Sequence, residues 1–248
     1  MIRNFVTALQ FLTVFTISRK HRVEEADLAR SMPYFPAIGF MLGVLVVYSD
    51  KALEWVFPHT IANAWLIIIY TLSTRALHLD GLADTLDGFM GGKDRGSRLS
   101  IMRDSRIGTA GVLGIVFSLL LKYLSLNNLF GDEKAAALLT APVLGRWSQT
   151  LMVFKANYGR ERGMGSAFVG HLRFGGLLAA AVIAAGLSAF VGARSAVVVM
   201  PAVAAFTLIA RRFIVRGIGG VTGDTIGAVS EINEVIVLLL FVVLSSGG

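Results

Sequence analysis

The sequence has no cysteine and little charge. Without thiols it cannot form disulfides, thiolate metal sites or cysteine nucleophiles. Only 16% of its 248 residues are charged, whereas a water-soluble domain carries about 25%. Hydrophobic residues make up 55% of the chain, and the mean hydropathy is +0.70. This composition excludes a disordered tail, a secreted disulfide scaffold and a large water-soluble enzyme, and it indicates a protein whose solvent is lipid.

Long apolar runs recur along the chain. A helix needs about 20 residues to cross the bilayer core, so they predict an all-α, polytopic membrane helix bundle of about seven transmembrane helices, in one domain over residues 1–248. Residues 5–17 form a shorter run without a signal-peptide cleavage site. This run predicts an N-terminal helix that is interfacial or partly inserted. The expected spans are roughly 34–50, 61–78, 108–129, 135–154, 175–192, 196–213 and 226–244.

The basic residues predict an orientation in the membrane. The chain has 23 Lys and Arg residues and a net charge of +7. Pairs of expected spans separate the segments that hold most of them, so these segments fall on one side, which the positive-inside rule makes cytoplasmic. The charge is therefore a topology signal and predicts no nucleic-acid partner. The basic segments are 1–35, 93–106, 155–173 and 211–216.

An acidic segment follows the second apolar run. At about 100° per residue along a helix, Asp80, Asp84 and Asp87 fall on one narrow face. Aligned carboxylates repel one another unless a cation lies among them, and carboxylate oxygen is a ligand that Mg²⁺ prefers. We therefore expect a Mg²⁺ site here, with a solvated acidic helix end as the alternative. His78 beside it is either a base or orienting group, or a structural residue.

The next polar segment suits a phosphate-bearing substrate. Arg103 and Arg106 abut the membrane and supply planar donors for phosphate, and Asp104 between them can add a metal ligand. The glycine-bracketed loop 157–165 either closes over a nucleotide or is a mobile connector. An ordinary basic loop explains the remaining cations of this region, which are Lys93, Arg95 and Arg98.

Later spans also carry charge. Arg146 lies within an apolar run, where it either faces the bundle interior or snorkels to the cytoplasmic surface. Asp224 opens the last span, where it contacts a ligand or caps the helix, and it shares a face with Glu231. Capping does not explain Glu231 and Glu234. We expect these two to contact substrate or metal, or to pair with Arg75 or Arg146.

Four segments together resemble the adenosylcobinamide-GDP ribazoletransferases, also called cobalamin 5'-phosphate synthases, over essentially the whole chain. The resemblance implies a Mg²⁺-dependent enzyme of late cobalamin biosynthesis in a bacterial or archaeal cytoplasmic (inner) membrane, with its active site facing the cytoplasm. Such an enzyme joins adenosylcobinamide-GDP to α-ribazole or its 5'-phosphate and releases GMP. The segments are His78–Gly88, Ile101–Gly108, Gly145–Ser148 and Gly220–Gly227.

The resemblance implies roles for the candidate residues. Arg103 and Arg106 would stabilise charge in the transition state. Asp87 is the preferred general base, with His78 and Glu231 behind it. The metal ligands would be Asp80, Asp84, Asp87 and Asp104, and the substrate-contacting residues would be Arg146, Asp224, Glu231 and Glu234. The partners are the two substrates and the lipid bilayer, while self-association and association with other corrinoid-assembly enzymes stay open.

Two rival functions are compatible with the pattern. The acidic segment also resembles, more weakly, the metal motif of CDP-alcohol phosphotransferases, although Asp84 stands where those enzymes have Arg. Alternatively, intramembrane Asp, Glu and Arg residues could line the pathway of an ion-coupled transporter. A transporter needs polar residues near mid-membrane with routes to both sides, whereas a CDP-alcohol enzyme releases CMP.

Overall fold

The computed structural model describes residues 2–17, 25–161 and 163–246. Within these ranges the regular elements are helices, and the only strand-like contact is an isolated parallel bridge between Tyr158 and Val221. The expected all-α class is confirmed. The elements are α1 (Ile2–Leu12), α2 (Glu25–Ser31), η1 (Met32–Tyr34), α3 (Phe35–Glu54), α4 (His59–Ser73), α5 (Leu77–Gly91), α6 (Arg95–Ile101), α7 (Thr109–Asn127), α8 (Gly131–Val153), η2 (Met164–Ala167), α9 (Phe174–Ile218) and α10 (Gly223–Ser246).

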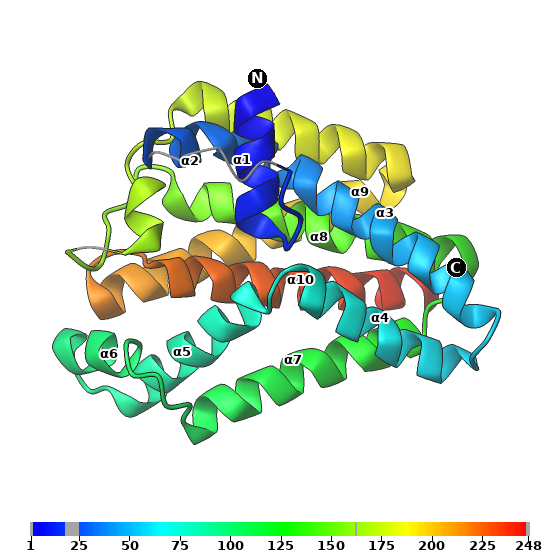
Figure 1. Ribbon diagram of the computed structural model, residues 1–248, viewed down its shortest axis with the longest axis horizontal. Helices are drawn as coiled ribbons and strands as arrows, with labels where there is room; N and C mark the ends of the chain where they lie inside the picture. The colour runs from blue at the N-terminus through cyan, green and yellow to red at the C-terminus, as the bar shows by residue number, and fades with distance from the viewer. Residues whose placement is uncertain (1, 18–24, 162, 247–248) are drawn as a thin grey trace.

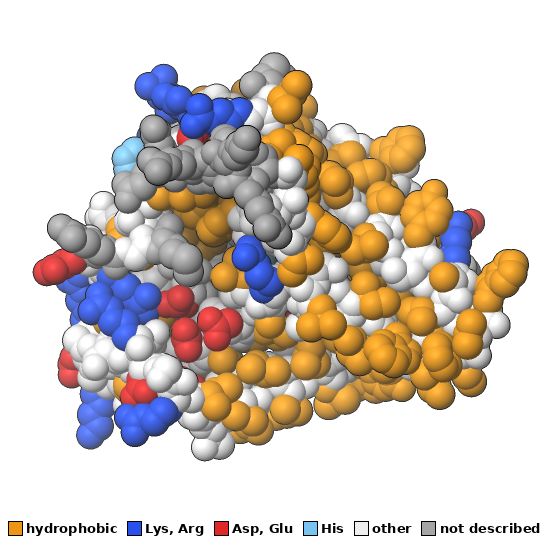
Figure 2. All heavy atoms as spheres, viewed as in Figure 1, with side chains coloured by type: hydrophobic (Ala, Val, Ile, Leu, Met, Phe, Trp, Pro, Cys, Tyr) orange, Lys and Arg blue, Asp and Glu red, His pale blue; other side chains and the backbone are white. Residues whose placement is uncertain are grey.

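The long helices lie side by side and alternate in direction between the two ends of the molecule (Figure 1). Helix α6, the segment 154–173 and the turn 219–222 all lie at one end. Many of the charged side chains gather at this end, whereas hydrophobic side chains cover much of the opposite part of the visible face (Figure 2). We call it the charged end. The chain order thus brings the basic segments together, apart from the part of 1–35 that lies outside the described residues.

Most of the expected spans are present as apolar helices. Among the described residues, five helical stretches are long and apolar enough to cross a membrane, and α4 with α5 would make a sixth. Helix α8, which covers the expected span 135–154, is not among them, because its charged and polar residues lower its hydropathy. The multi-pass bundle is confirmed, but the expected number of seven is not. The five stretches are Asp27–Glu54, Thr109–Asn127, Phe174–Gly192, Ala196–Ile218 and Gly223–Ser245.

Helix α8 lies at the centre of the bundle, and glycines let α3 rest directly on it. A Cβ atom on Gly39 would lie 2.4 Å from the carbonyl oxygen of Pro142, and one on Gly43 would lie 2.8 Å from the Cα of Leu139. The two glycines are four residues apart and therefore share a face of α3. This small-xxx-small spacing is typical of close helix packing in membranes.

The expected straight span 61–78 is broken instead. Helices α4 and α5 meet at an angle of 86°, because Arg75 and Ala76 adopt left-handed backbone conformations with φ of 55° and 53°. The Arg75 guanidinium donates to the carbonyl oxygens of Gln10 and Phe11, which ties the bend to α1. Among the described residues, Arg75 therefore does not pair with Glu231 or Glu234, which was one of the expected alternatives. The bend directs α5 toward the charged end.

Helices α1 and α9 lie on the outside of this core. Helix α1 has 11 residues, buries one face and is not one of the membrane-spanning candidates. Helix α9 is interrupted at Gly192, whose φ of −174° and ψ of 93° are not helical, and its two arms run back along each other. In the most apolar stretch of each arm, only 17% of the residues are buried in the first arm and 22% in the second. The outward face of α9 therefore suits contact with lipid, as exposed Phe190 and Phe213 illustrate.

Candidate active site

Helix α5 carries three of the predicted site residues. Because Leu77–Gly91 is one helix, the expected common face of Asp80, Asp84 and Asp87 exists. Asp80 is exposed, whereas the other two are half-buried. The three carboxylates nevertheless have different surroundings.

Asp87 holds the beginning of α7. Its Oδ2 accepts the backbone N–H of Gly108 at 2.7 Å, and its Oδ1 accepts that of Gly111 at 2.8 Å. A Cβ atom on either glycine would lie within 2.5 Å of this carboxylate. A negative charge at a helix N-terminus satisfies free N–H groups and the helix dipole. Asp87 therefore positions α7 against α5, a contact that the spacing of the acidic segment does not reveal.

Asp224, at the start of α10, lies near Asp80 and Asp84. Thr222 and Thr225 exchange the hydrogen bonds of a capping box at the start of α10. These two threonines therefore cap the helix, which was the alternative role considered for Asp224. A Cβ atom on Gly81 would lie 2.6 Å from the Asp224 carbonyl oxygen. Helices α5 and α10 thus meet backbone to backbone, and the charges of Asp80 and Asp224 both act on Asp84.

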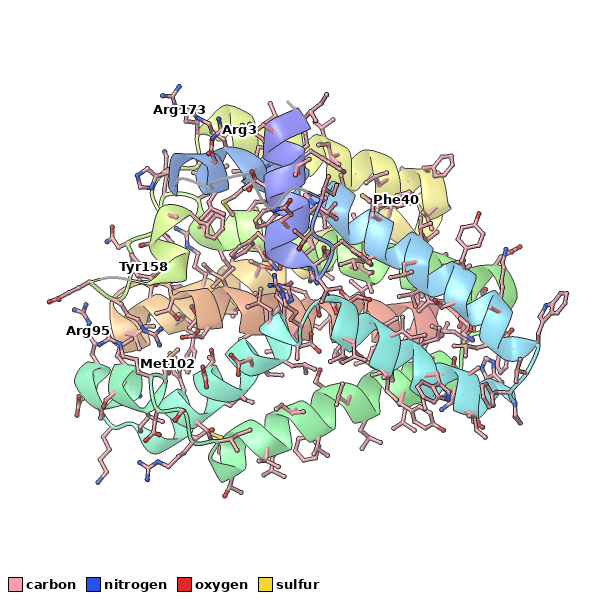
Figure 3. The ribbon with its side chains drawn as sticks, in the orientation of Figure 1. Arg3, Phe40, Arg95, Met102, Tyr158 and Arg173 are labelled. Atoms are coloured by element: carbon pink, nitrogen blue, oxygen red, sulfur yellow. The ribbon has the colours of Figure 1, made fainter. Side chains whose placement is uncertain are left out.

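Arg160 provides the opposite charge. Its guanidinium lies 2.6 Å from Asp224 Oδ2 and also donates to the carbonyl oxygen of Met102 at 3.3 Å. The loop that carries Arg160 is held to the start of α10, because Gly159 and Val221 join in the backbone bridge around Tyr158. Tyr158 and Met102 both lie at the charged end (Figure 3). The described part of the loop around Tyr158 and Arg160 is therefore held against the acidic residues.

A cavity of about 130 Å³ lies beneath this loop, between α5, α8 and α10. We call it the central cavity. Both α5 and α10 begin at it, and the positive ends of their dipoles favour anions there. Burial raises the pKa of the Tyr158 hydroxyl at its edge. Its polar lining consists mainly of His78, Asp80, Gln149, Tyr158, Arg160 and Asp224, and its apolar lining includes Phe11, Met32, Phe35 and Phe168.

The predicted phosphate clamp lies farther out. Asp104 accepts two hydrogen bonds from the Arg106 side chain, at 3.0 Å from Nε and 2.6 Å from Nη2. This guanidinium lowers the pKa of Asp104 to about 2. The side chains of Arg103 and Arg106 are solvent-exposed, and that of Asp104 is partly exposed. Asp104 and Arg106 border an open hollow at the start of α7 together with Asp87. The structure therefore brings these two close to α5 but not into the central cavity, and Arg103 lines neither.

Two of the basic-loop arginines have defined contacts. Arg98 donates to the carbonyl oxygens of Gly92 and Gly217, both at 3.1 Å, and lies over the ring of Phe89. Arg95 donates to the carbonyl oxygen of Gly159 at 3.4 Å. These side chains tie α6 to neighbouring elements, which an ordinary solvated loop would not require.

Arg146 faces the bundle interior, so the snorkelling alternative is wrong. Its side chain is fully buried and lies 2.7 Å from Glu234 Oε1. Lys122, which the sequence analysis did not single out, lies 2.6 Å from Glu231 and 2.7 Å from Glu234. The Tyr70 hydroxyl donates to Glu234 at 2.5 Å. Both glutamates are thus held in a buried ion network, and the expected pairing of Glu234 with Arg146 is confirmed.

The donor set at the central cavity fits Mg²⁺ as a partial site. Among the described residues, no group of three or more His, Asp or Glu side chains is arranged to hold a metal ion. Mg²⁺ usually binds one or two carboxylates, with waters and substrate phosphates completing its octahedron. Asp80 and Asp224, which line the cavity, and Asp84 beside them supply carboxylate oxygens of this kind, and the positive charge of Arg160 offsets part of their mutual repulsion.

The fold and this site define a multi-pass membrane protein with an acidic, arginine-flanked cavity at its charged end, an arrangement suited to phosphorylated substrates. The family model described as cobalamin-5-phosphate synthase matches residues 4–242, and the chain belongs to this family.

Curated relatives share its length. A protein of Geotalea daltonii is 38% identical over 98% of both chains, and one of Thermoanaerobacter sp. strain X514 is 36% identical over 98% of both. A protein of Herpetosiphon aurantiacus is 37% identical over 96% of this chain and 95% of its own. All three are named adenosylcobinamide-GDP ribazoletransferase. No solved structure matches the chain.

Proposed function

We propose that this protein transfers the adenosylcobinamide-phosphate moiety of adenosylcobinamide-GDP to α-ribazole or α-ribazole 5'-phosphate and releases GMP. Family membership and the names of the full-length relatives support this activity. The structural observation that carries it is the contact of Arg160 with Asp224 beside Asp80 and Asp84. A pyrophosphate substrate needs both a cation site and a guanidinium donor, and the proposal is supported by the presence of Asp80, Asp224 and Arg160 in the lining of one cavity.

The site residues take the following roles in the proposal. Asp80, Asp84 and Asp224 would hold Mg²⁺, which neutralises the pyrophosphate and stabilises the leaving GMP oxygen when bound. Arg160 would bind a phosphate oxygen inside the cavity. Arg103 and Arg106 would guide the anionic substrates in from the rim. Asp87 would keep α7 in place. Each of its carboxylate oxygens already accepts one backbone N–H, so to act as the general base it would have to accept the proton on a lone pair that these hydrogen bonds leave free.

The other candidate bases have different access to the cavity. Glu231 is buried, contacts Lys122 and does not line the central cavity. His78 does line it. A general base must come within hydrogen-bond reach of the acceptor hydroxyl, so the position of Glu231 does not support it as this base.

We also propose that the charged end faces the cytoplasm of a cytoplasmic (inner) membrane. The basic segments at this end follow the positive-inside rule, and nucleotide substrates are cytoplasmic. Cysteine introduced at exposed Lys93 should react with a membrane-impermeant maleimide only after the cells are opened. Labelling of intact spheroplasts would show that the charged end faces away from the cytoplasm and would contradict the proposed orientation.

The activity is tested with detergent-purified protein, adenosylcobinamide-GDP, α-ribazole 5'-phosphate and Mg²⁺. We expect GMP and adenosylcobalamin 5'-phosphate in equal amounts, resolved by liquid chromatography, and no GMP when the acceptor or Mg²⁺ is omitted. Failure to form GMP with any divalent metal ion would overturn the assignment. Release of CMP from a CDP-alcohol would favour the phospholipid enzyme instead.

A further inference from the structure

The central cavity has an aromatic wall that neither a metal ion nor a phosphate requires. The ring centroids of Phe11 and Phe168 lie 4.9 Å apart, and Phe35 lies 5.8 Å from Phe168 and 6.3 Å from Phe11. Met32 lines the same cavity. The three rings come from α1, α3 and the segment after η2, so the fold gathers them at this place. Such a surface suits a planar apolar group.

A chain of buried hydrogen bonds ends at the same cavity. The guanidinium of Arg146 can only donate, and it donates to Ser230 Oγ at 3.1 Å. The single hydroxyl hydrogen of Ser230 points to the carbonyl oxygen of Gly145 at 2.9 Å. The remaining partner of Ser230 Oγ is Gln149 Nε2 at 3.0 Å. Gln149 must therefore be the donor in this contact, which fixes the orientation of its amide.

The fixed amide determines which nitrogen of His78 carries a proton. The second hydrogen of Gln149 Nε2 points to His78 Nε2 at 2.8 Å. His78 Nε2 must accept this bond, so the proton lies on Nδ1. Within the described part of the chain, His78 Nδ1 has no hydrogen-bond partner. His78 lines the cavity together with the aromatic wall, and its Nδ1–H is available to donate to a ligand.

We propose that the central cavity is the acceptor site and binds the planar base of an aromatic nucleoside, with His78 Nδ1–H donating to the base. This inference rests on the proposed function, which supplies α-ribazole as the acceptor. The benzimidazole base of α-ribazole is apolar except for one ring nitrogen that can accept a hydrogen bond. Guanine carries donors as well as acceptors along its edges and fits this wall less well, so the GDP moiety binds elsewhere.

The proposal also explains the layout of the cavity. The base lies against Phe168, and the ribose then points toward Asp80, Asp224 and Arg160 on the polar side, where the phosphorus is attacked. Gln149 is a positioning residue, because it acts on the nucleoside through His78. Arg146 and Ser230 hold Gln149 in turn.

The first test is equilibrium binding of α-ribazole to the purified full-length protein. Phe168→Leu should weaken this binding about tenfold, since loss of a base–aromatic contact costs about that factor, and the KM for adenosylcobinamide-GDP should not change. Phe5→Leu is the matched control, because Phe5 packs on Tyr34 and does not line the cavity. Wild-type protein that does not bind α-ribazole, or equal binding by Phe168→Leu, would overturn the proposal.

The second test addresses the hydrogen bond with an indole nucleoside, in which C–H replaces the acceptor nitrogen. Wild-type protein should bind this analogue about tenfold more weakly than α-ribazole. Gln149→Glu can only accept, so it moves the proton to His78 Nε2, and the preference for α-ribazole should vanish. This ratio is measured within one protein and does not depend on the folded fraction. An equal preference in both proteins would contradict the role of His78.

The two proposals fail in different ways. A protein that binds α-ribazole as described but forms no GMP would refute the proposed transfer and leave the binding site intact. A protein that forms GMP while Phe168→Leu raises the KM for adenosylcobinamide-GDP instead would place the nucleotide in this cavity and refute the further inference.

Discussion

Gly81 of α5 lies against the backbone of Asp224 in α10, with room for a hydrogen atom but not for a methyl group. This contact brings together carboxylates that are far apart in sequence. It also places the first turns of two helices at the same cavity, so their dipoles act on the same anions. The acidic part of the site therefore depends on a residue that has no side chain.

Gly81→Ala should lower kcat/KM for GMP release about 100-fold. A Cβ atom 2.6 Å from the Asp224 carbonyl oxygen forces α5 and α10 apart, and a shift of about 1 Å in a catalytic group can cost this factor. The matched control is Gly186→Ala, because a Cβ atom at Gly186 on α9 would meet nothing within 4 Å. Normal activity of Gly81→Ala would show that the close approach is not needed.

Asp84→Ala and Asp224→Asn should each reduce turnover more than about 100-fold, because stabilisation of several kcal/mol by a bound metal ion is lost. The protein should still insert into membranes and elute as wild type from a sizing column. Asp132→Asn, at an exposed acidic residue of α8, should be fully active. Near-normal GMP release by Asp84→Ala would count decisively against the acidic face as a metal site.

Arg146→Met should destabilise the protein by about 3–5 kcal/mol, because removing one partner of a buried ion pair leaves an uncompensated charge. Thermal unfolding in detergent measures this change. Arg212→Met removes an exposed arginine from α9 and should leave the melting temperature almost unchanged. Equal melting temperatures for the two variants would show that the buried network is not needed for stability.

Asp104→Asn should leave the pH dependence of activity unchanged between pH 5 and pH 9. The Arg106 side chain lowers the pKa of Asp104 from 3.8 to about 2. A lowered pKa contributes stability that is present above the ordinary value and lost only as the pH falls toward 2. Asp104 is therefore ionised throughout the working range. A changed Mg²⁺ requirement in Asp104→Asn would instead restore its predicted role as a metal ligand.

Local periodicity correctly predicted one part of the site. Asp80, Asp84 and Asp87 share a face because α5 is a regular helix, and this follows from the sequence alone. The different roles of the three residues do not follow from the sequence, because Asp87 contacts Gly108 and Gly111 only when α7 packs on α5. Long-range contacts of this kind have no local signature.

The buried network shows a second limit of the sequence. Lys122 appeared as a single cation within an apolar run, and nothing nearby in sequence identified its partners, Glu231 and Glu234. By contrast, the four-residue spacing of Gly39 and Gly43 was visible and could have predicted the contact of α3 with α8. The bend at Arg75 had no signal, since arginine rarely adopts a positive φ.

The interruption of α9 at Gly192 offers a practical handle. The reversal between the two arms of α9 lies away from the charged end (Figure 1), and the arms are largely uncovered by protein. An epitope inserted there would sit on the far leaflet without touching the chemistry. Antibody fragments directed at such a tag would enlarge this small particle for electron cryomicroscopy while leaving the substrate entrance free.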